Sequence, residues 1–237
     1  MNDTAEIMVG ALAAMSPARQ AAVLGDVPER AAPWVRAAAE QGLAQGQLRY
    51  GRMLLEGRGV ARNQAQALAW FRKAAESGEP EAGNMVGRCL ENGWGALADP
   101  IEAAQWFRRA AEAGHAWAQY NLGHLLLDGL GVARDAQAAL GWYRRAAEQG
   151  HVRAMNLVAR CLEQGWGAAR DPSAAREWYR RSAEGGYFRG QFNYASILLA
   201  EGRGDEAAPL FEAALAGAPE DSRRAMAQAL THLEAAA

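Results

Sequence analysis

The sequence predicts an all-α solenoid of about five antiparallel helix pairs with a capping helix at each end. Three observations predict it: a motif that recurs every 36 residues, helical spacing of apolar residues within each copy, and no alternating strand pattern. The copies read WVRAAAEQG, WFRKAAESG, WFRRAAEAG, WYRRAAEQG and WYRRSAEGG, beginning at Trp34, Trp70, Trp106, Trp142 and Trp178. Stacked copies of such a unit would bury a continuous core.

The N-terminal segment, residues 1–32, is expected to form one or two short helices that cap the solenoid. Its apolar stretch follows Asp3 and Glu6 with no Lys or Arg, which argues against a secretory signal. Pro33 stands where the second helix of the first repeat should already run, so we expect a kink or a late helix start there.

The third repeat shows the two helices most clearly. Apolar residues recur at i, i+4, i+7 and i+8 over 118–129, which predicts the first helix. Gly123 should let a neighbouring helix approach closely. Asp135 is the predicted N-cap of a second helix that ends at Gly150. The same start point carries an N-cap and an N1 proline in two other repeats, Asp99-Pro100 and Asp171-Pro172.

The last repeat is shortened, because its second helix, DEAAPLFEAALAG, follows the first almost at once. The polar segment PEDSRRAMAQALTHLEAAA then predicts a C-terminal capping helix. The predicted organisation is therefore an N-terminal cap over 1–32, a solenoid over 33–217 and a C-terminal cap over 218–237.

Composition excludes several classes of function. The chain has 237 residues with 25 Lys and Arg against 27 Asp and Glu, so its net charge of −2 gives no bulk attraction to nucleic acid or an anionic membrane. It has no apolar run of about 18 residues that could span a bilayer. Two cysteines, Cys89 and Cys161, are too few for a secreted disulfide scaffold. We expect a cytoplasmic protein without a cofactor or a metal.

The repeat pattern, A-x3-LG-x2-L-x2-G-x-GV-x2-D-x2-A-x2-WY-x2-AAE-x-G, covers roughly residues 33–217. It resembles the Sel-one-like repeat family, a relative of the tetratricopeptide repeat. The resemblance implies a right-handed α-α superhelix that serves as a scaffold or adaptor for other proteins and is not an enzyme. Several secreted members join each helix pair by paired cysteines. This chain lacks those pairs, which fits a reduced compartment.

Charged columns of the second helices are interpreted as a solvated face. Each basic dyad, such as Arg144 and Arg145, is followed at i+4 by a glutamate, here Glu148, and such pairs add only a few tenths of a kcal/mol. His115 and His151 occupy equivalent positions in adjacent repeats. Ligands one repeat apart cannot easily converge on one ion, so no shared metal site is predicted.

The first helices carry the candidate binding surface. Stepping 100° per residue from their apolar side gives an opposite face that lines the concave groove in the resembling tetratricopeptide fold. This face is apolar or aromatic in repeats one, three and five and carries Asn, Arg and Glu in repeats two and four. The residues predicted to bind a partner are Leu48, Arg52, Asn84, Arg88, Trp117, Tyr120, His124, Asn156, Arg160 and Phe192.

The chemistry of this face suits an extended protein segment. Asn84 and Asn156 could bond a peptide backbone in both directions, and the arginines could fork onto carboxylates. Trp117 stands where the other repeats have Gln, Glu or Arg, so it is either a recognition residue or a local filler packed on the preceding turn.

The stretch RCLENGWG at 88–95 returns as RCLEQGWG at 160–167. Its cysteines fall in an apolar packing column and are too far apart for a disulfide. Its glycines mark the turn between helices, and Trp94 and Trp166 in that turn either cover the neighbouring repeat or take part in recognition. The arginines remain as candidates for binding.

Three functions stay open at this point. The first is a protein-binding scaffold whose concave groove holds a peptide or protein segment. The second, implied by the resemblance alone, is an accessory partner of a neighbouring cytoplasmic enzyme of iron or cell-envelope metabolism. The third is an enzyme, which the sequence disfavours because no phosphate loop, HExxH motif or nucleophile beside a plausible His and carboxylate occurs.

Overall fold

A computed structural model describes residues 3–16, 19 and 27–236, and these residues contain thirteen α-helices and no strand. The chain divides into two compact units, the first up to Ala118 with Leu130–Val132 and the second over Gln119–Gly129 with Ala133 onward. The first unit holds α1 (Asp3–Ala13), α3 (Pro28–Glu40), α4 (Ala44–Glu56), α5 (Gln64–Glu76), α6 (Pro80–Asn92) and α7 (Pro100–Glu112). The second holds most of α8 (Ala116–Asp128), then α9 (Ala136–Glu148), α10 (Val152–Gln164), α11 (Pro172–Glu184), α12 (Phe188–Ala200), α13 (Gly204–Gly217) and α14 (Glu220–Ala236).

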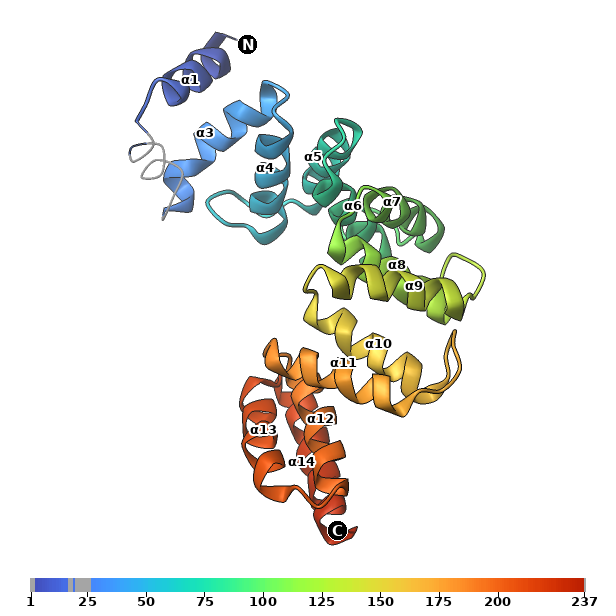
Figure 1. Ribbon diagram of the computed structural model, residues 1–237. Coiled ribbons are helices and arrows are strands. Elements are labelled where there is room, and N and C mark those ends of the chain that lie inside the picture. Colours follow the sequence, from blue (N-terminus) through green and yellow to red (C-terminus); the bar gives the residue numbers. More distant parts are fainter. Residues whose placement is uncertain (1–2, 17–18, 20–26, 237) are drawn as a thin grey trace. The chain divides into compact units, whose positions relative to one another are not determined.

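Consecutive helices pack as a solenoid within each unit (Figure 1). In the first unit α3 contacts α4, α4 contacts α5, α5 contacts α6 and α6 contacts α7. In the second unit the same succession runs from α9 to α13, and α10 also contacts α12, the next first helix of the series. The all-helical solenoid predicted from the 36-residue period is confirmed.

The core of each pair forms where an aromatic ring lies against a residue without a large side chain. A Cβ added to Gly87 would lie 2.6 Å from the ring of Phe107, and one added to Gly123 would lie 2.5 Å from the ring of Tyr143. Both rings are fully buried. The close helix approach predicted at Gly123 is confirmed, because only a missing side chain leaves room for the ring.

Polar caps begin the second helices as predicted. The carboxylate of Asp135 accepts a hydrogen bond of 2.9 Å from the backbone N–H of Ala138. Asn63, Asp99 and Asp171 cap their helices in the same way. His151 caps α10, with Nδ1 accepting from the N–H of Ala154 at 3.1 Å. The histidine column thus has a local structural role.

The turns between paired helices depend on glycine. Gly95 and Gly167 have φ angles of +84° and +74°, in the left-handed region that L side chains rarely adopt. A Cβ on Gly95 would overlap the carbonyl oxygen of Gln64, and one on Gly167 would overlap that of Ala136. Each turn therefore lies directly on the start of the preceding second helix.

Of the two alternatives expected at Pro33, the late helix start is wrong, and a kink there stays a prediction. Helix α3 begins five residues earlier, at Pro28, and runs through Pro33, whose side chain is exposed. A proline inside a helix removes one backbone hydrogen bond. The buried residues of α3 on both sides of it, including Ala32 and Val35, pack in the core and keep the helix continuous.

The two ends carry helices. At the N-terminus α1 contacts α3, and the second short helix expected before Gly25 lies outside the described residues. At the C-terminus α14 is the predicted capping helix, and its Leu230 and Leu233 pack against a cluster around Leu198 and Phe211. Figure 1 shows α12, α13 and α14 side by side.

Candidate functional site

The predicted binding residues divide evenly between the two units. The first unit contains Leu48, Arg52, Asn84, Arg88 and Trp117. The second contains Tyr120, His124, Asn156, Arg160 and Phe192. The two sets differ in which arginines form ion pairs and in how far the side chains are exposed.

The first unit contains two of the predicted arginines, Arg52 and Arg88, and a glutamate of the same chain forms an ion pair with Arg52. Arg52 of α4 forms an ion pair with Glu81 of α6, and Gln45 donates to Glu79 beside it. Burial lowers the pKa of His115, while Glu81 and Glu79 partly oppose that shift. Arg52 is therefore committed to its own chain in the structure.

Three of the predicted binding residues, two in the first unit and one in the second, are buried in the core. Leu48 is 2 % exposed, Asn84 5 % and Asn156 3 %. Leu48 lies among the buried residues of α4. These residues help to shape the surface, and a direct contact with a partner stays a prediction for each of them.

Trp117 is the large aromatic residue that the first unit leaves most open. Its side chain is 46 % exposed at the start of α8. Exposed tryptophan is a common anchor in protein interfaces, since it buries a large area with few rotatable bonds. Recognition by Trp117 stays a prediction.

The doubled stretch forms the same local structure in both units. The guanidinium carbon of Arg88 lies 5.4 Å from the ring centroid of Trp94, and that of Arg160 lies 5.5 Å from that of Trp166. Sequence reasoning found these arginines and tryptophans but did not pair them. A cation over an indole ring is attracted by about 0.5–1 kcal/mol at an exposed site.

The buried cysteines of the stretch are packing groups, as predicted. Cys89 is fully buried, Cys161 is 1 % exposed, and both are free thiols. Burial raises the pKa of each thiol to about 11. Both therefore stay protonated near neutral pH, which does not suit a nucleophile.

The basic dyads follow the predicted i+4 pairing only in part. Arg180 does pair with Glu184 as predicted. Arg72 instead reaches Glu102 of α7, at 2.8 Å. The second members of the dyads lie over the repeated tryptophans of their own helices, at 4.2 to 5.1 Å from the ring centroids: Lys73, Arg109, Arg145 and Arg181. This column is part of the framework.

In the second unit Tyr120 and His124 belong to an aromatic cluster. Tyr120 lies 4.6 Å from His124 and 4.8 Å from His151 between ring centroids, and Tyr143 packs against both Tyr120 and His124. Burial lowers the pKa of His124 and raises that of Tyr120. Tyr120 and His124 are half-buried, and a direct contact with a partner stays a prediction for both.

The remaining three predicted residues meet in one pocket of about 370 Å³. Helices α10, α12 and α14 contribute its lining residues: Asn156, Arg160, Arg189, Phe192, Asn193, Ser222, Ala225, Met226 and Ala229. Nδ2 of Asn193 donates to Oδ1 of Asn156 at 2.9 Å. The ring of Phe192 packs edge-on against Phe211, 5.2 Å between centroids. We call this the α10–α12–α14 pocket.

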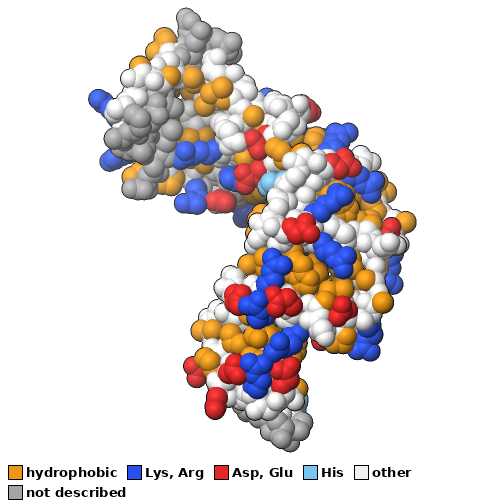
Figure 2. All heavy atoms as spheres, in the orientation of Figure 1, with side chains coloured by type: hydrophobic (Ala, Val, Ile, Leu, Met, Phe, Trp, Pro, Cys, Tyr) orange, Lys and Arg blue, Asp and Glu red, His pale blue; other side chains and the backbone are white. Residues whose placement is uncertain are grey.

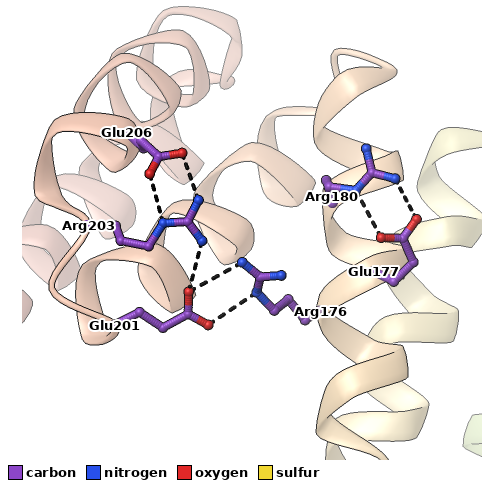
Figure 3. Close-up of polar contacts among 6 residues, drawn as sticks. All are labelled: Arg176, Glu177, Arg180, Glu201, Arg203 and Glu206. Carbon is purple, nitrogen blue, oxygen red and sulfur yellow. Dashed lines mark hydrogen bonds and ion pairs between the residues drawn. The ribbon is translucent and has the colours of Figure 1, made fainter.

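Its arginines differ from the arginines on the α11–α13 side of the same unit. Arg176 and Arg203 share the carboxylate of Glu201, and Arg203 also binds Glu206 through two bonds of 2.8 Å (Figure 3). Figure 2 shows basic and acidic side chains next to each other over this region. In contrast, the ion pairs of the described residues include neither Arg160 nor Arg189.

Sequence reasoning missed much of this pocket. Arg189 is the fifth repeat's equivalent of Trp117 and is not among the predicted binding residues. Asn193 and the α14 residues, such as Met226, were missed entirely. The sequence predicts α14 as a capping helix. Its residue pattern does not predict that α14 will lie next to the α10 and α12 residues of the pocket.

Two further observations bear on the class of site. The described residues contain no group of three or more His, Cys, Asp or Glu side chains placed to hold a metal ion. None of the described helices combines the length and apolar character that crossing a bilayer requires. What the structure presents is a set of polar and aromatic surfaces on the first helices.

Comparison with known proteins gives these surfaces a family context. The Sel1 repeat model matches residues 44–79, 80–115, 118–151 and 152–187, which together make up more than half of the chain. A crystal structure of a Sel1 repeat protein from Oxalobacter formigenes is 31 % identical, with a TM-score of 0.73 over 81 % of this chain and 78 % of the other. A search of curated proteins gave no match.

Two other solved structures are similar. A protective antigen of uropathogenic Escherichia coli strains is 33 % identical, with a TM-score of 0.71 over 81 % of this chain, which spans only 42 % of the antigen. An immunity protein from Pseudomonas aeruginosa is 17 % identical, with a TM-score of 0.54 over 78 % of this chain and 68 % of the other, and this likeness concerns the fold alone. The repeats and these matches show that the chain belongs to the Sel1 repeat family.

Proposed function

We propose that the protein is an interaction module that binds a segment of a partner protein on the first helices of the second unit. Sel1 repeat proteins generally mediate protein–protein interaction. The finer proposal rests on one observation: three of the predicted binding residues, Asn156, Arg160 and Phe192, line a single pocket.

The pocket has the mixed character of a peptide-binding surface. Arg160 and Arg189 supply charged donors, the Asn156–Asn193 pair supplies amide groups, and Phe192 supplies an apolar face. Peptide sites commonly combine apolar anchor pockets with a few polar groups that fix orientation. An extended segment could lie across α10 and α12 and insert side chains into it.

Site-specific photo-crosslinking in the native cytoplasm tests this function. A photoreactive residue at Ala225, which is exposed and lines the pocket, should join a discrete partner that mass spectrometry then identifies. The same residue at the exposed position Arg144 of α9, which lies outside the lining, is the matched control. Equal products from both positions, or none from Ala225, would count against a binding surface here.

A mutational arm separates this pocket from the candidates of the first unit. Arg160→Ala should weaken capture of the crosslinked partner, whereas Arg144→Ala should leave it unchanged. Trp117→Ala and Arg88→Ala test whether the first unit contributes. Circular dichroism of each variant shows that the helices remain. If Trp117→Ala and Arg88→Ala abolished capture and Arg160→Ala did not, the binding surface would belong to the first unit.

A further inference from the structure

The α10–α12–α14 pocket carries positive charge that its own walls leave uncompensated. Its nine lining residues include Arg160 and Arg189 and no Asp or Glu. Nearby on α10, the carboxylate of Glu163 is engaged by the hydroxyl of Tyr179 at 3.0 Å. The guanidinium carbon of Arg160 lies 5.5 Å from the ring centroid of Trp166, and that of Arg189 lies 5.7 Å from that of Phe188, but neither ring supplies a negative charge. Two arginines that line one cavity without an acid favour an anionic occupant, because a carboxylate would offset the repulsion between their positive charges.

Three arginines on the α11–α13 side of the second unit show the contrasting arrangement. Arg176, Arg180 and Arg203 each bind at least one glutamate of their own chain, and Figure 3 shows these pairs. Some other arginines of the unit, such as Arg144 and Arg145, are likewise in no ion pair of the described residues. Arg160 and Arg189 differ from these because they line the same cavity.

The other walls of the pocket narrow the kind of anion. Ala225, Met226 and Ala229 come from α14, and Phe192 comes from α12. These side chains offer apolar contact and no further charge. A bare inorganic anion would leave that apolar surface exposed to water. A peptide segment could cover it with an apolar residue next to the acidic one.

The amide pair beside the arginines suits a peptide backbone. Asn193 donates to Asn156 through one hydrogen bond, which uses one donor and one acceptor of the two side chains. Asn156 is only 3 % exposed, whereas Asn193 is half-buried, and the Oδ1 of Asn193 can accept a further hydrogen bond. A passing peptide unit presents an N–H group that could donate to it.

We infer that this pocket binds an acidic residue, Asp or Glu, of an extended partner segment, with an apolar residue next to it in that segment. The carboxylate would meet Arg160 and Arg189, and the apolar neighbour would lie between Phe192 and Met226. This inference rests on the proposed function and names the chemistry of the partner. The pocket volume of about 370 Å³ lies in the range of small ligand sites, ~300–1,000 Å³.

Fluorescence polarisation with the full chain tests it directly. The probe is a fluorescein-labelled Gly/Ser peptide with blocked ends that carries one Glu between two Leu residues. Replacing that Glu by Gln should weaken binding about tenfold, and replacing both Leu by Ser should weaken it several-fold. Raising the salt from about 0.05 M to about 0.5 M should weaken the Glu peptide more than the Gln peptide.

Protein variants locate the interaction. Arg160→Gln and Arg189→Gln should each lower affinity for the Glu peptide about tenfold and bring the Glu and Gln peptides close together. Met226→Glu, which places a negative charge in the apolar wall, should abolish binding. Arg144→Gln is the matched control, since it removes an exposed arginine of the same unit outside the pocket and should change nothing.

Other occupants would give different outcomes. A Gly/Ser peptide whose only carboxylate is its free C-terminus tests a chain terminus, and a phosphoserine peptide and a single-stranded oligonucleotide test phosphate. Stronger binding of any of these, or equal binding of the Glu and Gln peptides, would overturn the inference. If crosslinking from Ala225 still identified a partner whose binding did not depend on acidic residues, the proposed function would stand and only this inference would fall.

Discussion

The stretches 88–95 and 160–167 share nearly the same sequence and the same local structure, one in each unit. In both, the guanidinium carbon lies over the indole ring, at 5.4 Å from the centroid in the first and 5.5 Å in the second. In both, the cysteine is buried and its pKa is raised to about 11. In both, the second glycine of the turn lies against the preceding second helix.

The two stretches differ in what the rest of the chain places beside them. At the position 29 residues after Arg160 stands Arg189, whereas the same offset from Arg88 leads to Trp117. Glu163 of the second stretch accepts from Tyr179, while the equivalent ring in the first unit is Phe107, which has no hydroxyl.

The comparison teaches that a repeated sequence repeats its framework and not its surface chemistry. Contacts within one stretch depend on residues a few positions apart, which the repeat copies faithfully. Contacts of the exposed arginines depend on residues from other repeats and from the capping helix, which vary. Four measurements can break or sharpen this comparison.

The largest effect is expected in the shared turn. Gly95→Ala and Gly167→Ala should each lower the free energy of unfolding by about 3 kcal/mol or more, because the methyl group meets a backbone carbonyl at a positive φ. Gly150→Ala is the control: its φ is +87° but its surroundings are open, so it should cost only about 1–2 kcal/mol. Urea denaturation followed by circular dichroism measures all three. A similar cost for the control and the turn variants would contradict the packing of the turn.

The next effect separates the two glutamates. Glu163→Ala should cost about 1–2 kcal/mol of stability, because the buried hydroxyl of Tyr179 loses its acceptor. Glu91→Ala should change stability by less than about 0.5 kcal/mol, as expected for an exposed side chain. The same denaturation experiment compares them, and equal losses would show that the two stretches do not differ here.

A smaller and equal effect is expected for the arginine–tryptophan contacts. Double-mutant cycles with Arg88→Ala and Trp94→Leu, and with Arg160→Ala and Trp166→Leu, should each give a coupling energy of about 0.5–1 kcal/mol. A measurable coupling energy in only one unit would mean that the same arginine–tryptophan geometry does not give the same interaction energy in both units.

The smallest effect concerns pH. Although the Glu91 side chain is exposed, the surrounding protein still partly desolvates its carboxyl group, which raises the pKa of Glu91 above its usual value of 4.5, and Arg88 only partly opposes this shift. The folded chain then holds this proton more tightly than the unfolded chain, so stability is lost as pH rises from the unfolded pKa through the folded pKa. Glu91→Gln should therefore gain stability relative to the wild type between about pH 4 and pH 7. A constant difference over that range would show that Glu91 is not responsible.

Most of the fold could be predicted because its causes are local. The N-caps at Asp99, Asp135 and Asp171, the turn glycines and the small residue at Gly123 each act on neighbours that the 36-residue period keeps in register. The exception was the start of α3, where buried packing kept a helix continuous through Pro33.

The candidate site could be predicted only in part, because the sequence gives the face of a helix but not its partners. It placed Arg52 and Arg160 on equivalent positions of one face. In the tertiary structure Arg52 pairs with Glu81. Arg160 lines a pocket with Arg189 and Met226, and the lining residues of that pocket include no Asp or Glu.

The sequence by itself thus determined the repeat, the helices and the buried framework, since these follow from short-range spacing and capping. Only the tertiary structure decided which charges are compensated and where α14 closes a pocket. The physical reason is that ion pairing and cavity formation depend on distances between side chains of different repeats, and small differences in those distances decide whether a charge finds its partner within the chain or outside it.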